Sequence, residues 1–154
     1  MIVVGGNDVT HRVRTPTSTR HLAEAVRSLR QRGTEVVVGT CPDLGGLTAV
    51  PKPLRSLARI ASRQLAEAQR EVVTGLGGRA VSLAAVVGPF FLSAPDEMFA
   101  VDRFHPSGAG YRRTAKAMLP SVLAALGVTE AVPPGHYGPA PAPRAAASGS
   151  SGGS

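Results

Sequence analysis

An aspartate and a histidine stand three residues apart in the block Asp102-Arg103-Phe104-His105-Pro106, which precedes an amphipathic stretch. An imidazole needs a hydrogen-bond acceptor on one ring nitrogen to fix its tautomer, and its other nitrogen is then free to take a proton. Asp102 is near enough in sequence to be that acceptor, and Pro106 suits the start of a helix. The block predicts an Asp–His pair for acid–base chemistry. A polar loop with an incidental histidine is the alternative.

A second polar block lies near the other end of the chain. Residues 1–4 are apolar, and Gly-Gly-Asn-Asp follows at residues 5–8, which is the pattern of a buried strand ending in a turn. In open α/β sheets the chemistry takes place at the carboxyl ends of the strands. The Asn7 carboxamide is a neutral donor suited to an oxyanion. We expect Asp8 to shape the turn through hydrogen bonds, and His11 to be an exposed loop residue.

Apolar spacing divides the chain into alternating strands and helices. The helices are expected over about 19–32, 53–73 and 107–126, and the strands over about 1–4, 35–39 and 80–83. This alternation predicts a flavodoxin-like, three-layer α/β/α fold with a parallel sheet. Pro120 is expected to kink or divide the last helix.

Residues 84–101 contain two prolines and are expected to form an apolar loop. Its bulky side chains either line a pocket for an acyl group or pack beneath the loop; they are Phe90, Phe91, Met98 and Phe99.

Together, the Gly-Gly-Asn-Asp and Asp-x-x-His-Pro-Ser blocks resemble those of the SGNH (GDSL-type) hydrolase family. The resemblance implies hydrolysis of a small-molecule ester by a Ser-His-Asp mechanism, with no cofactor. It makes His105 the general base, Asp102 the residue that orients it, and Asn7 an oxyanion donor. It also implies that residues 1–127 form part of such a domain, with only the third to fifth strands of the family's five-stranded sheet. Without the family's first strand, residues 2–4 are expected to form an exposed apolar edge.

The family's Gly-Asp-Ser block, which carries the nucleophile, has no counterpart in the 154 residues. No serine of residues 1–127 lies in a Gly-x-Ser-x-Gly elbow, and the serines near the C-terminus are expected to be too flexible to hold catalytic geometry. We therefore expect the nucleophile in a segment before Met1. Three interpretations remain open: an ester hydrolase lacking its N-terminal part here, a catalytically inactive truncated remnant or interaction protein, and an unrelated α/β binding module.

The net charge of +7 comes from 17 basic residues against 10 acidic ones. A basic chain can bind nucleic acid, but the arginines are spread along the expected helices and there is no Trp for base stacking. Solvated helix faces are therefore the preferred interpretation, and no nucleic-acid partner is expected. No metal site is expected either, because the histidines lack zinc-ligand spacing.

The remaining sequence features concern disulfides, the cellular compartment, the oligomeric state and the C-terminal residues. Cys41 is the single cysteine, which excludes an internal disulfide. Neither a signal peptide nor a membrane-spanning apolar run is visible, so the compartment stays open and would be cytoplasmic if the chain were complete. The oligomeric state is also open. Residues 128–154 are rich in Pro, Ala, Gly and Ser and are expected to form a disordered tail.

Overall fold

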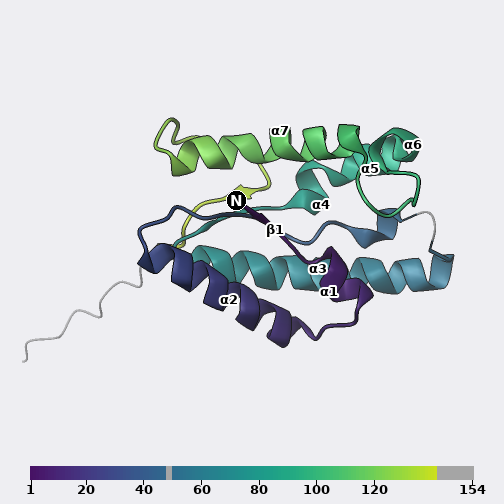
Figure 1. Ribbon diagram of the computed structural model, residues 1–154, viewed down its shortest axis with the longest axis horizontal. Coiled ribbons are helices and arrows are strands. Elements are labelled where there is room, and N and C mark those ends of the chain that lie inside the picture. The colour runs from purple at the N-terminus through teal and green to yellow at the C-terminus, as the bar shows by residue number, and fades with distance from the viewer. Residues whose placement is uncertain (48–49, 142–154) are drawn as a thin grey trace, which may run out of the picture.

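The computed structural model describes residues 1–47 and 50–141, which form three layers. Figure 1 shows helix α7 on one side of a central sheet and helices α2 and α3 on the other. The sheet has the order β1-β2-β3-β4, in which β1 to β3 are parallel and β4 is antiparallel to β3. The strands are β1 (Ile2–Val3), β2 (Val37–Gly39), β3 (Arg79–Val81) and β4 (His136–Tyr137). The predicted α/β class and parallel core of the sheet are thus confirmed.

The three long helices fall where the apolar spacing places them. They are α2 (Thr15–Gln31), α3 (Lys52–Gly75) and α7 (Gly108–Ala125). Pro120 lies inside α7, which continues through it; of the two expected effects, a kink or a division, the division does not occur. No helix within the described residues has both the length and the apolar character needed to cross a membrane.

Residues 84–101 are largely helical, and their prediction as a loop is wrong. They contain most of α4 (Leu83–Val86), α5 (Gly88–Ser93) and α6 (Pro95–Met98). Each of the last two helices carries its proline within the first two positions, where the missing N–H has no helical partner to lose. The two prolines therefore start short helices here. The remaining short elements are α1 (Gly6–Thr10) and η1 (Leu44–Gly46).

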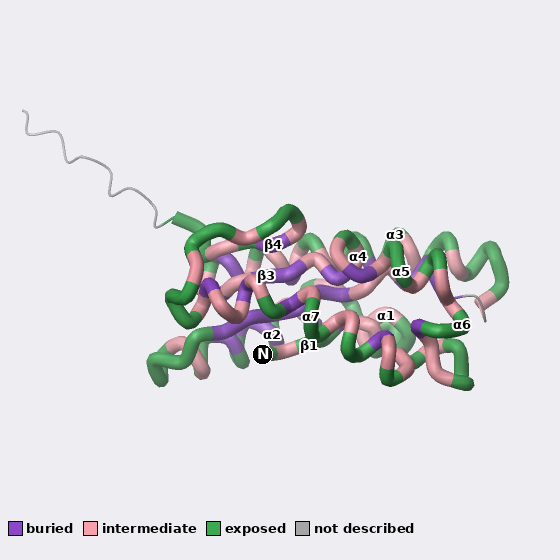
Figure 2. The backbone as a smooth tube through the Cα atoms, turned by 90° about the horizontal axis from the view of Figure 1, so that it is seen from above, coloured by how far each residue is buried: buried purple, intermediate pink, exposed green. Residues whose placement is uncertain are grey.

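Alternation along β2 and the residue before it, Val36, builds a core on both faces of the sheet. Val36 and Val38 pack with Val26 of α2, while Val37 packs with Met118 of α7. Successive side chains of a strand point to opposite faces, so a continuous apolar run serves both layers of helices. Figure 2 shows buried residues concentrated along the central strands.

The strand β1 pairs with β2 on one side and, among the described residues, with no strand on the other. Its side chains remain accessible: Val3 is 50% exposed and Val4 36%. The expected exposed apolar edge is therefore confirmed.

The segment expected to be a disordered tail, residues 128–154, contains a strand. His136–Tyr137 forms β4 on the edge of β3, and Gly135, at φ 86°, accepts a hydrogen bond from the Ser82 N–H at 2.8 Å. The prediction that disorder starts at residue 128 is thus wrong for this segment, because two strand residues suffice to pair with β3 in a Pro- and Gly-rich context. The rest of the predicted tail, residues 142–154, lies outside the described residues.

Burial of His136 predicts a pH-dependent stability. Its Nδ1 lies 2.7 Å from the Ser121 Oγ, and burial lowers the pKa of the imidazole. An unfolded histidine takes up a proton near pH 6.5 and the folded one only at lower pH, so the free energy of unfolding falls as pH drops below about 6.5. We expect the melting temperature, followed by circular dichroism, to fall between pH 7.5 and pH 5. His136→Gln should flatten that dependence, and an unchanged slope would contradict the assignment.

Candidate active site

The predicted contact between Asp102 and His105 is present. His105 Nδ1 lies 2.7 Å from Asp102 Oδ2, and Asp102 Oδ1 accepts hydrogen bonds from the backbone N–H groups of Phe104 and His105, at 3.0 Å each. Arg103 adopts a left-handed φ of 57°, which turns the chain back on itself. Its guanidinium also forms an ion pair with Asp96. One carboxylate thus holds both the ring and the backbone of the histidine.

These hydrogen bonds favour the ionised form of the Asp102 carboxylate. The bond from His105, followed by those from the two backbone N–H groups, lowers the pKa of Asp102 to about 2. The carboxylate is therefore ionised at any pH near neutrality. An ionised acceptor beside Nδ1 favours the tautomer with its proton on that nitrogen, which leaves Nε2 available as a base.

Ser107 fixes the end of the His loop, which comprises residues 99–107. Its Oγ accepts hydrogen bonds from the Ala109 and Gly110 N–H groups, at 3.1 Å each, and so caps α7. The same hydroxyl donates to the Glu97 carbonyl of α6 at 2.5 Å. Ser107 therefore ties the start of α7 to α6.

Backbone hydrogen bonds close the His loop. The Ala100 N–H donates to the His105 carbonyl at 2.7 Å, and the Ser107 N–H donates to the Met98 carbonyl at 2.8 Å. They form an antiparallel bridge whose partners are Phe99 and Pro106. The histidine therefore sits on a closed backbone ring.

Asn7 lies at the carboxyl end of β1, in the short helix α1. Its side chain is exposed and has no hydrogen-bond partner within the described ranges. Asp8 instead accepts a hydrogen bond from Ser18 Oγ of α2 at 2.6 Å, which agrees with the expected turn-shaping role. The exposed His11 ring lies 2.8 Å from the Asn7 main-chain carbonyl. His11 does not line the cavity that contains His105.

One cavity, with a volume of about 510 Å³, is lined by both Asn7 and His105. It opens at the carboxyl ends of the strands, as the sheet topology predicts. Much of its wall is apolar and comes from Leu44, Leu47, Leu83, Val87, Phe91 and Phe99. Among the described residues, no serine, lysine or arginine lines it.

Two of the four bulky residues considered for a pocket belong to this cavity. Phe91 and Phe99 line it as an edge-to-face pair with ring centroids 4.8 Å apart. Phe90 and Met98 line a different hollow. Leu44 and Leu47 were not singled out from the sequence, although their place just after β2 is the signal that could have found them.

Gly5 is required for the turn that presents Asn7. Its φ is 118°, and a Cβ there would lie 2.6 Å from the Cys41 Cβ. Gly5→Ala combines backbone strain with overpacking, and we expect it to lower the free energy of unfolding by about 2–4 kcal/mol. Urea denaturation measures this. Gly33→Ala is the matched control, because Gly33 also has a positive φ, 74°, but no atom within 4 Å of the added carbon. Equal losses in the two variants would contradict the close contact with Cys41.

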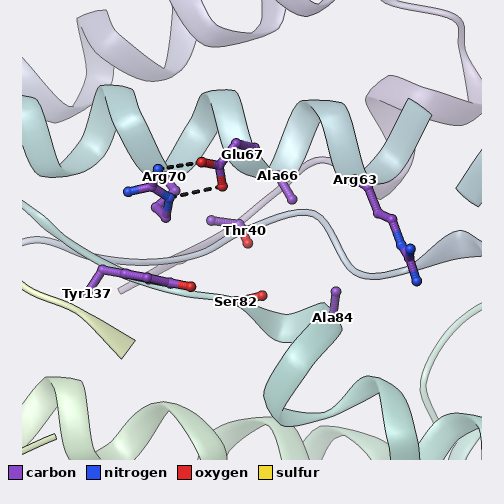
Figure 3. A pocket seen from close by; sticks show the side chains of 8 residues that line it. All are labelled: Thr40, Arg63, Ala66, Glu67, Arg70, Ser82, Ala84 and Tyr137. Atoms are coloured by element: carbon purple, nitrogen blue, oxygen red, sulfur yellow. Dashed lines mark hydrogen bonds and ion pairs between the residues drawn. The ribbon is translucent and has the colours of Figure 1, made fainter. Parts of the chain in front are cut away.

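A separate hollow of about 120 Å³ lies between α3 and the residues that follow β2 and β3, and Figure 3 shows it. Its charges are neutralised: Arg70 pairs with Glu67 and packs over the Tyr137 ring at 5.1 Å, and Arg63 pairs with Asp43. The bond from Arg70 lowers the pKa of Glu67. This hollow therefore offers no unpaired charge for chemistry.

The mostly parallel sheet has helices on both faces, and the Asp–His pair and Asn7 lie at the carboxyl ends of its strands, an arrangement suited to hydrolytic chemistry. The family model of the GDSL-like lipase/acylhydrolase family matches residues 1–113, and the chain belongs to that family. The resemblance seen in the two polar blocks is thereby confirmed.

A curated relative extends the comparison. The chain is 44% identical over 126 residues to the GDSL-like esterase Rv1075c of Mycobacterium tuberculosis. The match covers 82% of this chain but 40% of the relative, so the chain spans about 40% of that protein's length. No solved structure matches the chain.

Proposed function

We propose that this chain supplies the general base, the residue that orients it and an oxyanion donor of a serine ester hydrolase. The observation that carries the proposal is the 2.7 Å Asp102–His105 contact beside a cavity that Asn7 also lines. His105 takes the proton of a serine hydroxyl as that oxygen attacks the ester carbonyl, and later returns it to the leaving alcohol. Asp102 stabilises the imidazolium, and the Asn7 amide donates to the tetrahedral oxyanion.

The nucleophilic serine, in this proposal, comes from a segment outside these 154 residues. Several described serines already donate to other acceptors or pair with a buried imidazole; they are Ser18, Ser56, Ser62, Ser93, Ser107 and Ser121. None of them lines the cavity. The greater length of the esterase relative is consistent with such a segment.

The proposed substrate is a small-molecule ester with an uncharged acyl group. The apolar wall of the cavity favours burial of hydrocarbon. Its ionisable side chains are two carboxylates, Asp8 and Asp43, together with the His105 imidazole and the Tyr111 phenol. Since no cation lines it among the described residues, an anionic acyl group would lack a partner there.

A fluorophosphonate probe tests this function on the native gene product from its own cells. We expect labelling of a serine in a product heavier than the 15.8 kDa of these 154 residues. His105→Ala, introduced into the same gene, should abolish the labelling. An unlabelled product of 15.8 kDa would overturn the proposal and favour the catalytically inactive remnant or interaction protein instead.

A further inference from the structure

A groove between α5–α6 and α7 carries an excess of positive charge. Its volume is about 340 Å³. Three cations and one carboxylate line it, together with an apolar wall: Arg112, Arg113, Lys116, Glu97, Phe90 and Met98. We call this the basic groove. Its formal charge is +3 from the cations and −1 from Glu97, or +2.

The cations of the basic groove are unpaired. Within residues 1–47 and 50–141, no ion pair or side-chain hydrogen bond involves Arg112, Arg113 or Lys116. Other arginines of the chain do form ion pairs: Arg30, Arg59, Arg63, Arg70 and Arg103. Because cations collected in a concave surface reinforce one another's field, the groove attracts anions more strongly than an equally charged convex face.

Arg113 is held in place by an aromatic ring. Its Cζ lies 3.3 Å from the centroid of Phe90. A guanidinium fixed on a ring loses less conformational freedom when it binds an anion, and its N–H donors match phosphate oxygens. The ring and Met98 give the same groove an apolar wall.

We propose that the basic groove binds a dianionic phosphate monoester that carries a small apolar group. The charge of +2 matches a dianion, and the apolar wall accepts the organic part. Its volume is at the lower end of the range of small-molecule pockets. An open hollow of this size accommodates one small molecule, whereas a bilayer surface would need a protruding face.

The basic groove is separate from the candidate active site but adjoins the residues that hold the His loop in place. Tyr111 and Thr114 of α7 line the cavity of His105, whereas the three cations lie along the groove on the same helix. Glu97 and Met98, whose carbonyls bind Ser107, form the groove wall. A ligand in the groove therefore contacts the residues that hold the His loop.

Titration calorimetry with phenyl phosphate at pH 7.5 and fixed ionic strength tests the groove, and it requires no catalytic serine. In R112Q/R113Q/K116Q we expect binding at least about tenfold weaker, since hydrogen bonds to charged groups are lost. The matched control R20Q/R27Q/R32Q removes three exposed charges from α2 and its C-terminal end; it should bind within about twofold of the wild type.

Other outcomes overturn the proposal. No binding by the wild type would mean that the groove does not take this ligand. Equal weakening in both triple variants would mean that general charge attraction, and not the groove, causes the binding. Inorganic phosphate binding as tightly as phenyl phosphate would remove the role of the apolar wall. Vesicles of phosphatidic acid and phosphatidylcholine distinguish a lipid headgroup: binding to vesicles without binding to phenyl phosphate would assign the groove to a membrane surface.

Discussion

Replacement of His105 by Asn in the active gene product is expected to lower kcat/KM for an ester by about 10⁴-fold or more. The asparagine side chain cannot take the serine proton, so the nucleophile stays a weak neutral hydroxyl. Hydrolysis of p-nitrophenyl acetate measures the effect. His21→Asn is the matched control, because His21 is an exposed residue of α2 that does not line the cavity. A similar loss in both variants would point to misfolding and contradict the assignment.

Asp102 and His105 should act as one unit. Asp102→Asn alone is expected to cost about 10⁴-fold in kcat, because it removes the anion that fixes the imidazole tautomer. In the double variant with His105→Asn, the loss should barely exceed that of the histidine change alone. Multiplicative losses would mean that the 2.7 Å contact has no catalytic role.

Asn7→Ala is expected to lower kcat by about 10²–10³-fold and to leave KM almost unchanged. The amide would bind the oxyanion, which exists only beyond the ground state, so its loss raises the barrier without weakening substrate binding. Steady-state kinetics separate the two parameters.

His11→Ala controls for distortion of the turn that carries Asn7. The His11 ring contacts the main-chain carbonyl of Asn7 and lies outside the cavity lining. Its kcat should stay within about threefold of the wild type. A raised KM with unchanged kcat in Asn7→Ala would place this side chain in ground-state binding and overturn the oxyanion assignment.

The sequence predicts best what is local or periodic. The Asp102–His105 contact joins residues three apart, and the alternation of Val36, Val37 and Val38 follows from the geometry of one strand. The place of Leu44 after β2 indicates only the end of the sheet at which it lies, because its contribution to the cavity wall depends on tertiary packing.

Two structural features were missed for a different reason. The two prolines of residues 84–101 accompany the expectation of a loop, although at the first positions of α5 and α6 Pro89 and Pro95 are compatible with helix. The strand β4 is only two residues long and lies among prolines and glycines, so composition obscured it. In both cases the position of a residue in the chain mattered more than the average preference of its residue type for helix, strand or loop.

The closed His loop has a consequence for assembly. All the hydrogen bonds and the ion pair described above as holding Asp102 and His105 lie within residues 96–110. None of these bonds involves β1 or anything that packs against its open edge, so this half of the site is preorganised before a nucleophile arrives. If the nucleophile comes from a separate segment, as proposed, covalent continuity with it is not required for this half of the site to form. A separately expressed fragment that adds its strand beside β1 is expected to restore activity by complementation in trans.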